Sequence, residues 1–178
     1  MKKTLYISTI LLGLQLSNAQ STKPTIGEKI EGHFSTKNNT ENLFVKLSKK
    51  GHGNPVEDGV PDEYTLLSNS KTIKALKIGC CEVILINEGD LNGDGLDEIS
   101  VVQAPMNGCT YTFSTFTNVN GVWKKLFEPF MFSNECEPLS NKDLLNKVFV
   151  EKGVIYSMQT DPNDENMKLK KVEMKVLK

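Results

Sequence analysis

The sequence predicts an all-β fold that is an antiparallel meander sheet or sandwich. First, short apolar or alternating runs, separated by turn residues, recur from residue 43 onwards and suffice for roughly 8–10 strands. Second, Asn120-Gly121 lies between two such runs, which is the strongest local signal for a hairpin. Third, long amphipathic helices are not evident, and the best helical candidate is the short segment 141–148, which Ser140 can cap.

Each expected strand follows from its pattern of apolar residues. Residues 111–115 alternate between aromatic or apolar and small polar side chains, which is typical of a strand with one face in the core. Residues 83–86 are continuously apolar and residues 99–102 are similar, with Ser100 as the one polar residue, which indicates strands buried on both faces. The remaining expected strands are 43–47, 64–67, 122–127, 149–150, 154–158 and 167–177.

The beginning of the chain has the layout of a secretory signal peptide. Lys2 and Lys3 precede an uncharged, mostly apolar run over 5–16, and cleavage after Ala19 is expected. The run is shorter than the ~20 residues of a spanning helix, although an uncleaved anchor is the alternative. We therefore predict a signal peptide over 1–19, a loosely ordered polar lead-in over 20–41, and a single β domain over 42–178. The mature protein would be secreted or periplasmic.

Charge and hydropathy argue against nucleic-acid binding and against a membrane span. The net charge is −1, and all 21 basic residues are lysine. Arginine forks onto phosphates and guanines, so its absence argues against nucleic-acid binding. No segment after the signal peptide is long and apolar enough to cross a membrane, so no membrane span is expected in the mature chain.

The segment 90–98 carries oxygen-bearing side chains at regular spacing. Acidic or amide residues occupy positions one, three and five of this loop, and glycine occupies position six. Ca²⁺ prefers six to eight oxygen ligands, and glycine permits the turn that brings the next carbonyl inward. We predict a site for one Ca²⁺ ion, with Glu98 binding directly or through water; its ligands are Asp90, Asn92, Asp94, the backbone carbonyl of Leu96, and Glu98.

An EF-hand does not fit this loop, because position twelve is Val101 and the flanking segments are expected to be strands. The pattern Asp-x-Asn-x-Asp-Gly-x-x-Glu between two strands resembles the calcium-binding motif of FG-GAP or VCBS-type repeats, with Glu98 where those repeats carry Asp. The resemblance implies a structural Ca²⁺ ion. The segment 58–62 resembles the end of a second copy, but Val56 stands where a ligand oxygen is needed, so this copy is expected to bind no metal.

Repeats of this kind often build propeller blades. The runs 83–87, 99–103, 111–118 and 122–127 would form one four-stranded meander of that type. A closed propeller needs about four or more blades. The chain is too short for that number, so we do not expect a closed propeller.

Four cysteines, an even number, favour two disulfides in an exported protein; they are Cys80, Cys81, Cys109 and Cys136. A zinc site lacks the usual Cys-x₂-Cys pair, and a bridge between adjacent cysteines is strained. In the expected meander all four lie at the end opposite the calcium loop. We predict that one of Cys80 and Cys81 pairs with Cys109 and the other with Cys136, without deciding which.

The sequence contains no nucleophile motif, so we expect no enzymatic activity. Aromatic residues 123, 127, 130 and 132 would form either part of the core or a face for a sugar or protein. The favoured hypothesis is a non-catalytic interaction protein with an unknown protein or glycan partner and a structural Ca²⁺ ion. The alternative is an extracellular hydrolase of unrecognised type that also uses Ca²⁺ structurally.

Overall fold

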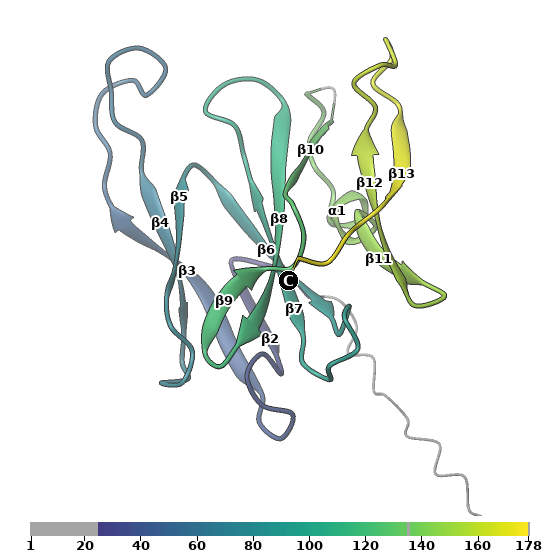
Figure 1. The fold of residues 1–178 in the computed structure, drawn as a ribbon. Coiled ribbons are helices and arrows are strands. Elements are labelled where there is room, and N and C mark those ends of the chain that lie inside the picture. The colour runs from purple at the N-terminus through teal and green to yellow at the C-terminus, as the bar shows by residue number, and fades with distance from the viewer. Residues whose placement is uncertain (1–24, 135, 178) are drawn as a thin grey trace, which may run out of the picture.

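The computed structural model describes residues 25–177 except residue 135 (Figure 1), so the predicted signal peptide lies outside the described residues. The described chain is all-β, as predicted, and every strand pair is antiparallel. The central sheet has the order β1 (Thr25–Gly27), β6 (Val83–Gly89), β7 (Glu98–Gln103), β8 (Thr110–Val119) and β10 (Phe130–Ser133), with β9 (Val122–Lys125) also on β8. A second sheet contains β2 (Lys29–Gly32), β3 (Glu41–Lys49), β4 (Glu63–Ser68) and β5 (Leu76–Cys80). A third sheet contains β11 (Val148–Glu151), β12 (Val154–Thr160) and β13 (Leu169–Glu173).

The central sheet is covered on both faces, as Figure 1 shows. Successive side chains of a strand point to opposite faces. Leu85 of β6 therefore enters a core shared with the second sheet, whereas Ile86 enters a core shared with the third sheet and α1 (Asn141–Leu145). Both side chains are fully buried. This explains why the runs 83–86 of β6 and 99–102 of β7 are mostly apolar on both faces.

The predicted four-stranded meander is confirmed as β6, β7, β8 and β9. Asn120 and Gly121 form the turn between β8 and β9, and both have positive φ. Strand β8 is long enough to pair twice along one edge, with β10 near its start and with β9 near its end. No sheet of the described chain closes into a propeller.

The described part of the expected lead-in is ordered, so the prediction of a loose segment over 20–41 is wrong for residues 25–41. β1 adds to the central sheet and β2 adds to the second sheet. Phe34 is fully buried in the core between them and packs edge-on against Trp123. Two short strands and one aromatic anchor therefore hold a segment whose composition is largely polar.

The predicted helix over 141–148 is present but shorter. Ser140 accepts a hydrogen bond from the backbone N–H of Asp143 and so caps α1, as expected. Val148 already belongs to β11. The last strand, predicted over 167–177, is likewise restricted to β13. In the described part of the chain, no helix has the length and apolarity of a membrane span.

Candidate metal loop and its surroundings

The loop between β6 and β7 is folded around its first acidic residue. The carboxylate oxygens of Asp90 accept hydrogen bonds from the backbone N–H groups of Gly93 and Gly95, each at 2.8 Å. Gly95 has φ +87, a left-handed conformation that favours glycine. The sequence pattern thus produces the tight turn that it predicts, and the backbone curls around the Asp90 carboxylate.

Asn92 and Asp94 continue the same turn. The side-chain oxygen of Asn92 accepts from the N–H of Asp94, and Asp94 Oδ1 accepts from the N–H of Leu96, each at 2.8 Å. The Asn92 amide nitrogen lies 3.1 Å from Asp94 Oδ2 and 2.9 Å from Glu98 Oε1. One amide group therefore bridges two of the predicted metal ligands.

Glu98 lies at the base of the loop and is fully buried. Its Oε2 atom accepts from the N–H of Leu91 at 2.8 Å and from that of Asn92 at 3.2 Å. Burial raises the pKa of the Glu98 carboxyl group to about 7, and hydrogen bonds from Leu91, Thr117 and Asn92 offset part of this effect. The pKa is raised a little further by the charge of Asp94.

The structure therefore brings the five predicted calcium ligands into one loop. Within residues 25–177, residue 135 excepted, no three His, Cys, Asp or Glu side chains converge closely enough to form a metal-binding group. The donor set is nevertheless the hard-oxygen set that Ca²⁺ prefers, and it includes an amide and a backbone carbonyl besides carboxylates. The bridging amide of Asn92 would have to move for its neighbours to converge on an ion.

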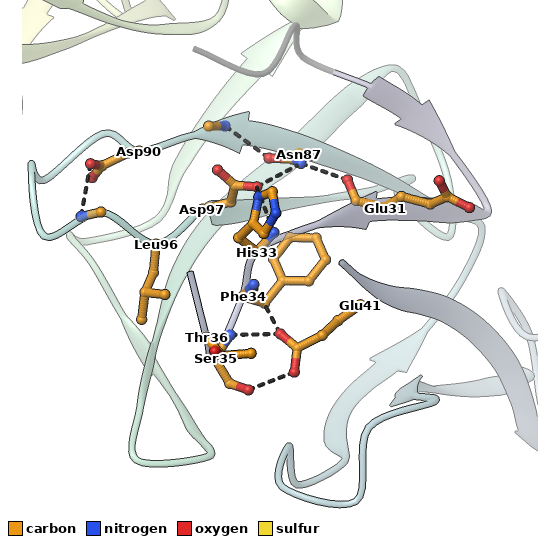
Figure 2. A network of polar contacts seen from close by, with 12 residues as sticks. Glu31, His33, Phe34, Ser35, Thr36, Glu41, Asn87, Asp90, Leu96 and Asp97 are labelled. Atoms are coloured by element: carbon orange, nitrogen blue, oxygen red, sulfur yellow. Dashed lines mark hydrogen bonds and ion pairs between the residues drawn. The ribbon is translucent and has the colours of Figure 1, made fainter. Parts of the chain in front are cut away.

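Asp97 is a polar anchor that the sequence pattern did not single out. Its carboxylate accepts from the backbone N–H of His33 at 2.8 Å and from the Asn87 amide at 3.3 Å, as Figure 2 shows. The same Asn87 amide also donates to the carbonyl of Glu31 at 2.7 Å. Asp97 and Asn87 therefore fix the segment after β2 against the base of the loop.

Glu88 is a second acid next to the loop, and it is partly buried. It lies in the irregular register between β6 and β7, where Asn87 pairs with Ile99 and Gly89 pairs with Glu98. Among the described residues, its Oε1 atom has no hydrogen-bond partner. Burial raises the pKa of Glu88 to about 8, with a partly compensating hydrogen bond from Ser100.

The cysteine pairing predicted from the meander is wrong. The disulfides are Cys80–Cys81 and Cys109–Cys136. The reason is β10, which pairs with the start of β8 and carries Cys136 to Cys109. Cys80 and Cys81 therefore bond to each other, and Cys81 adopts a φ of +80.

The aromatic residues form part of the core and do not form a binding face. Trp123 is 8% exposed and Phe127, Phe130 and Phe132 are at most 6% exposed.

The segment 58–62, which resembles the end of a second copy of the motif, ends in an acid that already has partners. The carboxylate of Asp62 accepts hydrogen bonds from the backbone N–H of Gly51 and from the Lys50 side chain. These contacts occupy Asp62 within its own turn.

The fold and loop define this chain as a layered all-β protein with two disulfides and an acidic turn between two central strands. The chain matches no protein-family model, no curated protein and no solved structure.

Proposed function

We propose that this protein is an exported, non-catalytic interaction module whose 90–98 loop binds one structural Ca²⁺ ion. The observation that carries the proposal is the loop geometry. Hard-oxygen groups are concentrated in nine residues, and backbone amides already hold the carboxylates of Asp90 and Glu98 in place. The resemblance to FG-GAP or VCBS-type repeats supports the same ion, and the partner would be a protein or a glycan.

The chemistry of the loop supports a cation rather than a purely structural turn. Asp90, Asp94 and Glu98 would repel one another when all three are ionised, and a Ca²⁺ ion would supply the compensating charge. Asp90, Asn92, Asp94 and Glu98 would bind through side-chain oxygens, and Leu96 would bind through its carbonyl. In that role the ion would tie β6 to β7 at the centre of the fold.

Two disulfides support export, because such bonds persist in oxidising compartments. The space outside the cell and the periplasm are both oxidising, so a secreted and a periplasmic protein fit equally well. The absence of a nucleophile motif in the sequence supports a binding role over catalysis. Turnover of ester, peptide or glycoside substrates that disappears on mutation of an acidic residue outside 90–98 would instead support a hydrolase.

Thermal unfolding with millimolar Ca²⁺ and with a chelator tests the calcium proposal. We expect Ca²⁺ to raise the unfolding free energy by about 2.7 kcal/mol at a hundredfold excess over its dissociation constant. Asp94→Ala should abolish this stabilisation, since it removes a ligand from an exposed position. Asp58→Ala is the matched control, because Asp58 is an exposed acid in the other loop, and it should keep the full response. Identical unfolding curves with Ca²⁺ and with chelator would refute the proposal.

A further inference from the structure

A polar cavity of about 530 Å³ lies among three segments that are distant in sequence, and no residue of the calcium loop lines it. Its first segment neighbours the loop, because the side chain of Lys37 lies against Gly95. Residues 35, 36 and 39–41 form one wall, residues 69, 70 and 72 form another, and the Asn120-Gly121 turn forms the third. Apart from Gly121, every described residue that lines it bears a hydroxyl, an amide or a carboxylate group. We call this cavity the hydroxyl pocket.

The pocket is organised around the carboxylate of Glu41. This residue is 4% exposed, and its Oε2 atom accepts from the backbone N–H groups of Phe34 at 3.0 Å and Ser35 at 2.7 Å. Its Oε1 atom accepts from the hydroxyl of Ser35 at 2.6 Å, a contact visible in Figure 2. The charge is therefore fixed in position before any ligand arrives.

A chain of hydroxyl groups leads from this carboxylate along the pocket. Ser35 Oγ lies 3.2 Å from Thr72 Oγ1, which lies 2.7 Å from Ser70 Oγ. A hydroxyl group has one proton, and an ionised carboxylate can only accept. The Ser35 hydroxyl donates its one proton to Glu41. Thr72 must therefore donate to Ser35, and Ser70 must donate to Thr72. The chain consequently presents oxygen lone pairs, and no free O–H donor, to a ligand.

These features select a ligand class. A ligand needs hydrogen-bond donors for the hydroxyl chain and acceptors for the side-chain amides of Asn39, Asn69 and Asn120. Among the described residues that line the pocket there is no lysine and the one charged group is the Glu41 carboxylate, so an anion is disfavoured. Its lining offers no large apolar side chain for an apolar ligand. The volume falls within the ~300–1,000 Å³ range of small-molecule sites.

We propose that the hydroxyl pocket binds a neutral saccharide, whose hydroxyl groups both donate and accept hydrogen bonds. This inference deepens the proposed interaction role by naming a glycan as its ligand, and it does not require the calcium loop. No aromatic side chain lines the pocket to stack on a sugar ring, so binding is weak, with dissociation constants on the order of millimolar.

Two-dimensional ¹H–¹⁵N NMR of the mature protein tests this inference, with maltose, cellobiose and N,N′-diacetylchitobiose as probes. Saturable shifts confined to amides of residues 35–41, 69–72 and 120–121 are expected from at least one sugar. Thr72→Val preserves shape but removes the hydroxyl group, and it should weaken binding at least fivefold. Ser70→Ala should do the same. Thr110→Val, at an exposed position outside the pocket, should leave binding unchanged.

Three results would overturn the inference. They are no saturable shift with any of the three sugars, shifts that persist unchanged in both Thr72→Val and Ser70→Ala, and pocket shifts with choline but with no sugar. The last would assign the pocket to an ammonium ligand. Titrations in chelator separate this test from the calcium proposal, because sugar binding should persist there. If Ca²⁺ fails to stabilise the protein, the saccharide proposal is unaffected. If no sugar binds, the calcium proposal is unaffected.

Discussion

At the scale of single residues, the most unusual feature is the partly buried acid beside the loop. The Oε1 atom of Glu88 is shielded from water and has no hydrogen-bond partner among the described residues, and burial raises the pKa of its carboxyl group to about 8. A group with such a pKa keeps its proton in the folded protein over a range in which the unfolded chain has already lost it. Glu88 is thus a source of pH-dependent stability.

The direction of this dependence can be predicted for the protein in chelator. Between pH of about 4.5 and about 8 the folded state binds one more proton at Glu88 than the unfolded state, so stability should fall as pH rises, by about 1.4 kcal/mol per pH unit for this group. Glu88→Gln should remove that part of the slope. Urea unfolding at pH 5, 6, 7 and 8 measures it. An unchanged slope in the variant would show that Glu88 is not protonated in the fold.

At the scale of elements, the strands and turns that could be predicted are those determined by residues close together in the sequence. Alternation over 111–115 and the Asn120-Gly121 pair were enough to locate β8, β9 and their turn. The tight acidic turn over residues 90–98 was predictable for the same reason, because its residues occupy one short loop. Strand β10 was not predicted, since its four residues form a strand through their pairing with β8, which the local sequence does not reveal. The wrong disulfide pairing followed directly from that omission.

The polar sites outside the loop were not predictable, because they join distant segments. Glu41 meets Ser35 within one segment, but Thr72 completes the hydroxyl chain from 37 residues away. Asp97 bonds to the amide of His33 across 64 residues. Only the folded topology brings such groups together. Their residue types, Ser, Thr, Asn and Asp, are also the ordinary residues of turns.

The β8–β9 turn allows a prediction at this scale. Gly121 has φ +82, and an added Cβ would collide with the backbone carbonyl of Thr72. Gly121→Ala should therefore lower the unfolding free energy by more than the ~1 kcal/mol of a left-handed backbone alone. Gly153→Ala is the matched control, because its φ is +78 and the space around it is open. Chemical denaturation should show the larger loss for Gly121→Ala, and equal losses would contradict the close approach.

At the scale of the whole molecule, the two disulfides have unequal effects. Cys109–Cys136 closes a loop over a sequence separation of 27, whereas Cys80–Cys81 closes essentially none. In the chain-entropy model the first bond contributes about 3–4 kcal/mol and the second contributes little. Replacing Cys109 and Cys136 together by serine should thus shift the urea midpoint far more than replacing Cys80 and Cys81. Comparable shifts would show that native-state contacts of the bonds outweigh chain entropy.

The position of Cys109–Cys136 also governs how the protein would respond to mechanical load. Tension applied between the two ends of the chain cannot extend the segment between these cysteines, which contains β8, β9 and β10. At ~3.4 Å per residue, roughly 90 Å of contour length stays hidden until the bond is reduced. A pulling experiment would therefore record a shorter final extension in oxidising than in reducing buffer. While it is oxidised, the bond therefore limits how far the chain can be stretched.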